Sequence, residues 1–361
     1  MNGLIARLHD DVRNASAGIR EILGLIAVLI ALVALFGLTT ERFLSQATFT
    51  SIAFQLPVLG LLALAMMIPM LTAGLNLAIT YSANFSALVF AWTIQAGGGP
   101  DAGTGVFILA VAASLVSGAV IGWLMGVIIA HTRAHPILVS LSMMIFLRGL
   151  GEFLTRGGDV SGFPPIVATL GQGLLLGIPL PLWIFGVCVA LWTLILGRTR
   201  LGFNIYLSGS NIEATRYSGV DTTRVITLVY TLSGIMCAVA GMVMLARFNS
   251  VRVGHGESYL LITVLACFLG RVDPFGGFGR VLPVLISLVI LQVIGSGLNL
   301  LGTNQHLATA LWGLLLVLVM ALRFAWAWWQ QQRGPRRAAG PGGSRPVKPD
   351  HPIVNERQTE S

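Results

Sequence analysis

Long runs of apolar residues that contain few charges recur along the chain from residue 22 to residue 326. A run of roughly 20 such residues is long enough to cross the hydrocarbon core of a bilayer as an α-helix. Only 10% of the residues are charged and the mean hydropathy is +0.83, so the chain has too little charge to cover a water-soluble surface. The sequence therefore predicts an all-α, polytopic membrane protein.

The apolar runs predict about ten transmembrane helices joined by short loops. We expect them near residues 22–38, 51–71, 75–95, 106–130, 136–154, 175–196, 225–246, 259–270, 281–301 and 308–326. The eighth run is too short to cross alone unless it begins within the preceding loop. These runs define one transmembrane domain at residues 22–329, after a cytoplasmic segment at 1–21. The tail at 330–361 mixes Pro, Gly, Arg and Ser without an apolar period, which predicts disorder.

The arginines are distributed unevenly between the predicted loops. One set of loops holds Arg7, Arg13, Arg20, Arg133, Arg198, Arg200, Arg216, Arg224, Arg271, Arg280, Arg323 and the basic tail, and the other holds Arg42, Arg156, Arg247 and Arg252. Because cytoplasmic loops carry the excess of basic residues, this bias places both termini and residues 197–224 in the cytoplasm, which requires an even number of spans. A cleaved signal peptide is the weaker alternative, since no small-residue cleavage site follows the first run.

Residues 197–224 form a long, polar and basic interruption among the apolar runs. Within it, residues 212–218 have the pattern of a short helix. Asn211 or Ser210 is placed to cap its start. Glu213 lies near its positive end, and Gly219 suits its C-terminal stop. A helix of two turns is unstable alone in water, so we expect either a groove on a soluble partner or lipid head groups to hold it.

Two sets of polar side chains recur at helical spacing inside the predicted spans. They are Asn76, Thr80 and Asn84 in the third span, and Gln292, Ser296 and Asn299 in the ninth. Each set falls on one helical face, and neutral amides and hydroxyls can both donate to and accept from hydroxyl-rich solutes. The pattern predicts a substrate path, and the alternative is hydrogen bonding from helix to helix.

Arg148 and Glu152 form the one ionisable pair that falls inside a predicted span, at positions i and i+4 of the fifth. Because charge in a membrane is costly, we expect the two to pair with each other or to face a wet cavity. If Arg148 and Glu152 pair with each other, their role is structural. A titrating Glu152 would instead be a proton site.

The chain lacks the residue patterns of nucleotide, metal and catalytic sites. Its single lysine, Lys348, lies in the tail, so no Gly-rich phosphate loop ending in lysine is present. No zinc pattern occurs, and no serine has a His and an acid that the sequence would place beside it. The three cysteines lie in apolar runs and predict no disulfide. The net charge of +8 is scattered, unlike the basic stripe of a nucleic-acid-binding protein. We expect no enzyme, metal site or bound cofactor.

Three ordered motifs resemble those of a known family. They are GSNIEATRYSGV at 209–220, SLSMMIFLRGL at 140–150 and GSGLNLLG at 295–302. They are similar to motifs in the membrane subunits of ribose-type sugar ABC importers, within the branched-chain amino acid/ribose permease superfamily. The resemblance runs from about residue 50 to residue 325, and it identifies the superfamily without identifying a sugar.

The resemblance implies a ten-helix permease of the bacterial cytoplasmic membrane that carries a monosaccharide or a similar small polar solute. Its implied partners are ABC ATPase subunits that use ATP and Mg, a second permease, and a periplasmic or lipid-anchored binding protein. The helix at 211–218 is implied to couple to the ATPase through Asn211, Glu213, Ala214, Arg216, Ser218 and Gly219. The alternatives are a permease for a nucleoside, a branched-chain amino acid or a signalling furanose, and a proton-driven secondary carrier.

Two stretches depart from the family pattern. Residues 74–81 read GLNLAITY where the family has Gly-Ile-Asp-Leu-Ser-Val-Gly-Ser, and residues 270–277 read GRVDPFGG where it has Gly-Gly-Thr-Ser-x-x-Gly-Gly. These departures indicate a divergent subgroup. They leave the cargo open, and also the choice between homodimer and heterodimer.

Overall fold

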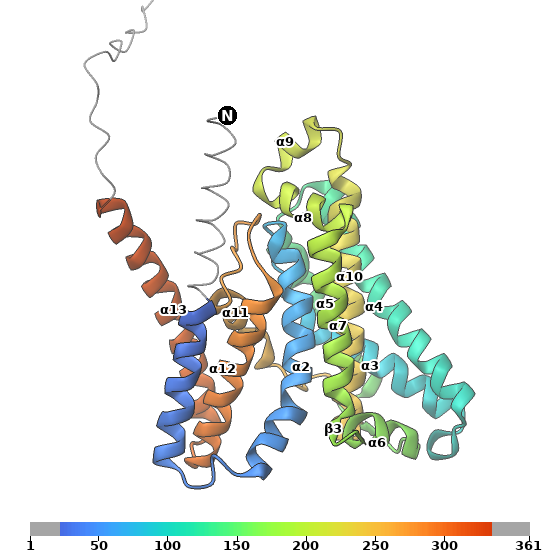
Figure 1. Cartoon of the computed structure of the whole chain (residues 1–361). Coiled ribbons are helices and arrows are strands. Elements are labelled where there is room, and N and C mark those ends of the chain that lie inside the picture. Colours follow the sequence, from blue (N-terminus) through green and yellow to red (C-terminus); the bar gives the residue numbers. More distant parts are fainter. Residues whose placement is uncertain (1–21, 334–361) are drawn as a thin grey trace, which may run out of the picture. The chain divides into compact units, whose positions relative to one another are not determined.

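The computed structural model describes residues 22–333, and most of them are helical (Figure 1). The helices are Ile22–Thr39, α2 (Gln46–Leu71), α3 (Ile79–Ala96), α4 (Thr104–Thr132), α5 (Pro136–Thr155), α6 (Pro165–Gln172), α7 (Leu180–Arg198), α8 (Arg200–Ser210), α9 (Ile212–Tyr217), α10 (Thr222–Phe248), α11 (Tyr259–Leu269), α12 (Val281–Leu300) and α13 (Gln305–Arg333), with a 3₁₀ turn at Gly99–Asp101. The chain divides into two units, residues 1–319 and 320–361, and every contact described below lies within the first.

Short strands join some of the connections between the helices. Strand β1 (Val160–Ser161) pairs antiparallel with β4 (Ser250–Val251), which links the α5–α6 connection to the segment after α10. Strands β2 (Leu174–Leu175) and β3 (Ile178–Pro179) form a hairpin before α7. The prediction of a span from residue 175 is therefore wrong at its start, because Gly177 turns the chain with a positive φ of 78° and α7 begins only at Leu180.

Seven of the described helices are long and apolar enough to cross a membrane: Ile22–Thr39, α2, α4, α5, α7, α10 and α12. This result confirms the predicted class. Helix α11 has 11 residues, so at about 1.5 Å per residue it covers roughly half of a 30 Å hydrocarbon core, as its short apolar run predicted. Helix α13 continues to Arg333, past the predicted start of the tail at residue 330. The segment 1–21 and the tail from 334 lie outside the described residues.

Helices α2 and α10 form the centre of the first unit. From Pro57 to Leu71 every residue of α2 is buried, and α10 packs against α2, α3 and α4. Small residues allow this contact, because a Cβ at Gly118 or Gly122 of α4 would overlap the carbonyl oxygens of Gly234 and Tyr230 on α10. Close backbone approach of this kind is a usual means of packing helices in membranes.

Candidate functional site

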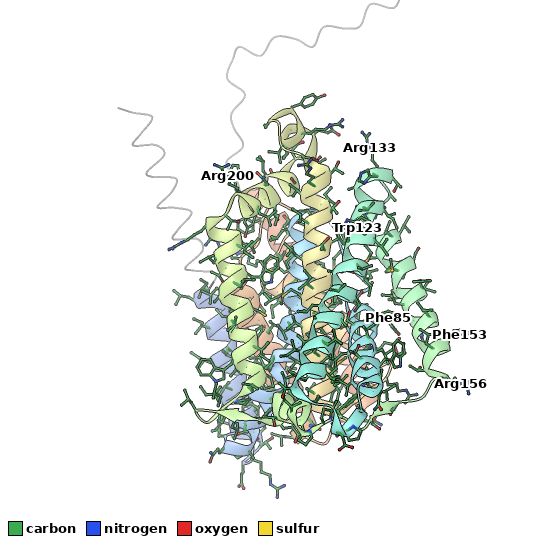
Figure 2. The ribbon with its side chains drawn as sticks, turned by 90° about the vertical axis from the view of Figure 1, so that its right-hand side faces the viewer. Phe85, Trp123, Arg133, Phe153, Arg156 and Arg200 are labelled. Atoms are coloured by element: carbon green, nitrogen blue, oxygen red, sulfur yellow. The ribbon has the colours of Figure 1, made fainter. Side chains whose placement is uncertain are left out.

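Three of the predicted loop arginines lie at two different ends of the first unit. Figure 2 shows Arg133 and Arg200 near one end and Arg156 near the other, and Figure 1 places α9 at the end that carries α8, the helix of Arg200. We call these the α9 end and the opposite end. The separation agrees with the two loop sets that the arginine pattern predicted for these three residues.

Helix α9 has the start and the stop that the sequence predicted. The Asn211 side chain accepts a hydrogen bond from the Ala214 N–H at 3.0 Å, and Gly219 follows the helix with φ of 83°. The Ser218 hydroxyl donates to the Ala214 carbonyl at 2.9 Å. The prediction of one short helix within a loop was incomplete, because residues 200–210 form a second helix, α8, capped by the Thr199 side chain.

The α9 side chains are presented outward. Only Thr215 is buried, whereas the predicted coupling residues Asn211, Glu213, Ala214, Arg216, Ser218 and Gly219 are all exposed. Glu213 and Arg216 also line a hollow of about 550 Å³, between α9, the end of α4 and the start of α10. The α9 end of the structure therefore presents both an exposed helix and a charged recess beside it.

Helix α8 ties α9 to the rest of the bundle. The Gly277 N–H donates to the Leu71 carbonyl at 2.9 Å, and the Tyr206 hydroxyl donates to the Gly279 carbonyl at 2.7 Å. Burial raises the pKa of Tyr206, although Arg280 opposes the shift. Gly209 lies against Leu71 and Gly277 so closely that a Cβ there would overlap their backbone atoms. The end of α2 and the α11–α12 connection therefore meet immediately before α9.

The polar residues predicted on the third span do not share one helical face. Helix α3 begins at Ile79, so Asn76 lies in the irregular segment before it, where it is fully buried. Its side chain donates to the Ser233 hydroxyl at 3.0 Å and accepts from the Ala78 N–H at 3.1 Å. Because both ends of the amide are bonded within the protein, the geometry favours a structural role for Asn76, which is the alternative to a substrate path.

Thr80 and Asn84 lie on α3, and both are buried. The Asn84 amide donates to the carbonyls of Val253 and His255 at 2.7 and 2.9 Å. The Thr80 hydroxyl has no hydrogen-bond partner among the described residues. Asn84 therefore holds the segment after α10 against α3. Its bonds again favour the structural alternative.

Arg148 and Glu152 form the predicted pair, and they also face a cavity. The Arg148 Nε lies 3.1 Å from Glu152 Oε1, and its Nη1 lies 3.6 Å from Glu257 Oε1, which also accepts a bond from the Tyr81 hydroxyl at 3.1 Å. The Arg148 and Glu152 side chains are 52% and 51% exposed. The cavity, of about 590 Å³, is lined by Arg148, Glu152, Thr155, Gly157, Arg252, Val253, Gly254, His255 and Glu257.

His255 lies on the wall of this cavity, and its surroundings shift its pKa. Burial lowers its pKa below the ordinary value, Arg252 lowers it further, and Asp159 opposes them. Asp159 Oδ1 lies 3.7 Å from Arg252 Nε. The network therefore joins α3 and α5 to the connection between α10 and α11 at the opposite end from α9.

The polar residues predicted on the ninth span lie on α12, and two of the three line one cavity. Gln292 and Asn299 face a cavity of about 240 Å³, whereas Ser296 does not line it. The Gln292 amide donates to Gln55 Oε1 on α2 at 3.0 Å. The lining residues are Gln55, Leu59, Ser258, Tyr259, Ile262, Leu291, Gln292, Gly295, Leu298, Asn299, Thr303, Ala308 and Trp312.

One short segment borders both cavities. Glu257 lines the cavity of Arg148 and Glu152, which we call the charged cavity. The next two residues, Ser258 and Tyr259, line the cavity of Gln292 and Asn299, which we call the neutral cavity. Sequence reasoning missed Glu257 and Gln55. A signal was present for Gln55, since an amide inside an apolar run calls for a polar partner or a wet surface.

Apolar helices long enough to cross a bilayer, with polar cavities between them, define a multi-pass membrane protein of the transport class. Residues 48–320 match the model of the family described as branched-chain amino acid transport system / permease component. The match covers most of the chain, and the chain belongs to this family. It is therefore a multi-pass permease of the inner membrane.

Two curated relatives are similar over most of their length. The chain is 34% identical to the ribose import permease protein RbsC of Escherichia coli strain K12 over 295 residues, which is 80% of this chain and 89% of the relative. It is 29% identical to the autoinducer 2 import system permease protein LsrD of Yersinia enterocolitica over 307 residues, which is 83% of this chain and 91% of the relative. No solved structure matches the chain significantly.

Proposed function

We propose that the chain is the permease subunit of an ATP-binding-cassette importer and forms the path for a monosaccharide or a similar small polar solute. The observation that carries the proposal is the neutral cavity of Gln55, Gln292 and Asn299 between α2 and α12. Amide side chains supply donors and acceptors without a net charge, and the nearby Trp312 ring supplies an apolar wall. Such a lining suits an uncharged, hydroxyl-rich solute. The names of the two relatives, a ribose and an autoinducer-2 import permease, support this class of cargo.

The proposal includes the arrangement of the partners. We infer about ten spans from the lengths of the apolar runs. The arginine bias then puts both termini and α9 in the cytoplasm. ATPase subunits that use ATP and Mg dock at the α9 end, and a substrate-binding protein delivers solute at the opposite end. A second permease, identical or different, completes the path. The support for the ATPase end is the exposed, capped helix α9 beside a charged recess.

Reconstitution tests this function. The chain is placed in liposomes with ATPase subunits and a binding protein from the same source, and uptake of labelled ribose and labelled leucine is followed. We expect uptake of the sugar only when ATP and all partners are present, and loss of uptake in Glu213→Lys, which reverses a charge on the exposed face of α9. Uphill uptake by the chain alone without nucleotide would contradict the proposal.

Replacing Gln292 by Leu should weaken transport by about tenfold. The change removes the amide that donates to Gln55 Oε1 and leaves that oxygen without its donor, although the Gln55 amide nitrogen keeps its bond to the Ser51 hydroxyl. Loss of one buried hydrogen-bond partner costs roughly 1–3 kcal/mol. The initial rate of ATP-driven sugar uptake measures the effect, normalised to the amount of permease in the membrane.

Ser296→Ala is the matched control for this prediction, because Ser296 lies one turn further along α12 and does not line the cavity. We expect it to retain the uptake rate of the unchanged chain. Equal rates for Gln292→Leu and Ser296→Ala would exclude the cavity from the path.

A further inference from the structure

Two strongly exposed aromatic residues lie at the α9 end. One is Tyr217 on α9, and the other is Phe275 on the connection between α11 and α12. Phe275 is 84% exposed there, and Tyr217 at the end of α9 is 89% exposed. Figure 1 shows this connection rising toward α8. We propose that residues 271–279, which we call the 271–279 loop, form the second part of the ATPase docking surface, with Phe275 as its anchor. This inference rests on the proposed function.

The loop holds Phe275 in a fixed turn. The Asp273 carboxylate accepts a hydrogen bond from the Phe275 N–H at 3.0 Å. The Gly276 N–H donates to the Asp273 carbonyl at 3.0 Å, and the Asp273 N–H donates to the Phe278 carbonyl at 2.9 Å. These bonds close the loop on itself while the Phe275 side chain remains exposed. An aromatic side chain that is already positioned loses little freedom when a partner covers it.

The loop and α9 share one support. Gly276 and Gly277 have φ of 90° and 77°, a region that favours glycine. A Cβ on Gly276 would lie 2.7 Å from the Gly209 carbonyl oxygen, and Gly209 is close to the N-cap of α9. The loop and the start of α9 are therefore supported by the same backbone contacts.

The composition of this surface fits a soluble protein better than lipid. Two exposed aromatic rings are accompanied by Glu213 and Arg216 on α9 and by Asp273 on the loop. Aromatic anchors within a charged and polar rim are typical of protein interfaces. The partner that we assign to this surface is the ATPase, because the proposed function already places the ATPase against α9.

Photocrosslinking tests the assignment in the full permease assembled with the ATPase subunit that supports uptake. A benzophenone amino acid is placed at position 275, at position 217 or at position 153. Phe153 is the matched control, because it is 78% exposed and lies near Arg156 at the opposite end (Figure 2). We expect ATPase adducts from positions 275 and 217 and none from position 153.

The outcomes separate the loop from the function. Adducts from 217 without adducts from 275 overturn the inference and leave the proposed function standing, and so do adducts from 275 to lipid alone. Adducts from neither position contradict both. In a second measurement, Phe275→Ala should weaken co-purification of the ATPase at least tenfold, because an anchor at the centre of an interface carries much of its affinity. Phe275→Tyr should restore it, and Phe153→Ala should have no effect. Unchanged co-purification in Phe275→Ala overturns the inference.

Discussion

Gly219→Pro is expected to abolish ATP-driven uptake while the permease still accumulates in the membrane. Gly219 ends α9 with φ of 83°, and its N–H donates to the Arg216 carbonyl at 3.0 Å. Proline fixes φ near −65° and has no N–H, so it can provide neither the positive φ nor the hydrogen bond to the Arg216 carbonyl. Helix α9 has only six residues, and short helices are unstable alone, so we expect the loss of its C-terminal stop to unwind it. The expected loss of uptake is more than tenfold.

The measurement compares uptake and ATPase binding in liposomes that contain equal amounts of permease. Gly219→Asn is the matched control, since asparagine visits the left-handed region more readily than other non-glycine residues and keeps the N–H. We expect it to retain most of the uptake. If Gly219→Pro transported as well as Gly219→Asn, the stop of α9 would have no part in coupling to the ATPase.

Local signals in the sequence predicted α9 well. The cap at Asn211, the exposed Glu213 and the stop at Gly219 all depend on residues within one turn of the helix ends, so the sequence contains the information directly. Helix α8 was missed because residues 200–210 are more polar than a span and were assigned with the loop. Its one buried face, with Ile205 and Gly209, depends on contacts with distant segments.

The start of α3 could not be predicted from apolar length. Leu75 and Leu77 continue the apolar pattern on both sides of Asn76, yet the chain is not helical there. The segment is stabilised instead by bonds from Asn76 to Ser233, which is 157 residues away. Pairings over such distances are set by tertiary packing, and a polar periodicity that ignores them assigns Asn76 to a helical face it does not occupy.

The candidate path could be predicted only where its residues lie on one helix. Gln292 and Asn299 are seven residues apart, a spacing that returns to one helical face, and both line the neutral cavity. Their neighbour across the cavity, Gln55, lies 237 residues away from Gln292. Likewise the i, i+4 spacing predicted Arg148 with Glu152, but only the fold brings Glu257 to the same guanidinium.

Gly209→Ala is expected to destabilise the permease by about 1–3 kcal/mol, the usual cost of forcing an extra group into a packed site. The added Cβ would overlap the Leu71 carbonyl oxygen and the Gly277 nitrogen. Both are backbone atoms, so no side-chain rotation relieves the overlap. The Gly277–Leu71 hydrogen bond at 2.9 Å must lengthen, which separates the α11–α12 connection from α2. Thermal unfolding in detergent measures the loss, and uptake should fall with it because α9 loses its support.

Gly197→Ala is the matched control for this prediction. Gly197 lies near the end of α7, and a Cβ there would meet no atom within 4 Å. Alanine is a better helix former than glycine by about 0.5–1 kcal/mol, so Gly197→Ala should match or exceed the stability of the unchanged chain and keep its uptake. The same substitution then has different effects on stability at two sites on the consecutive helices α7 and α8. Equal melting temperatures for the two variants would show that the contact between Gly209, Leu71 and Gly277 is looser than described, and that α9 is supported elsewhere.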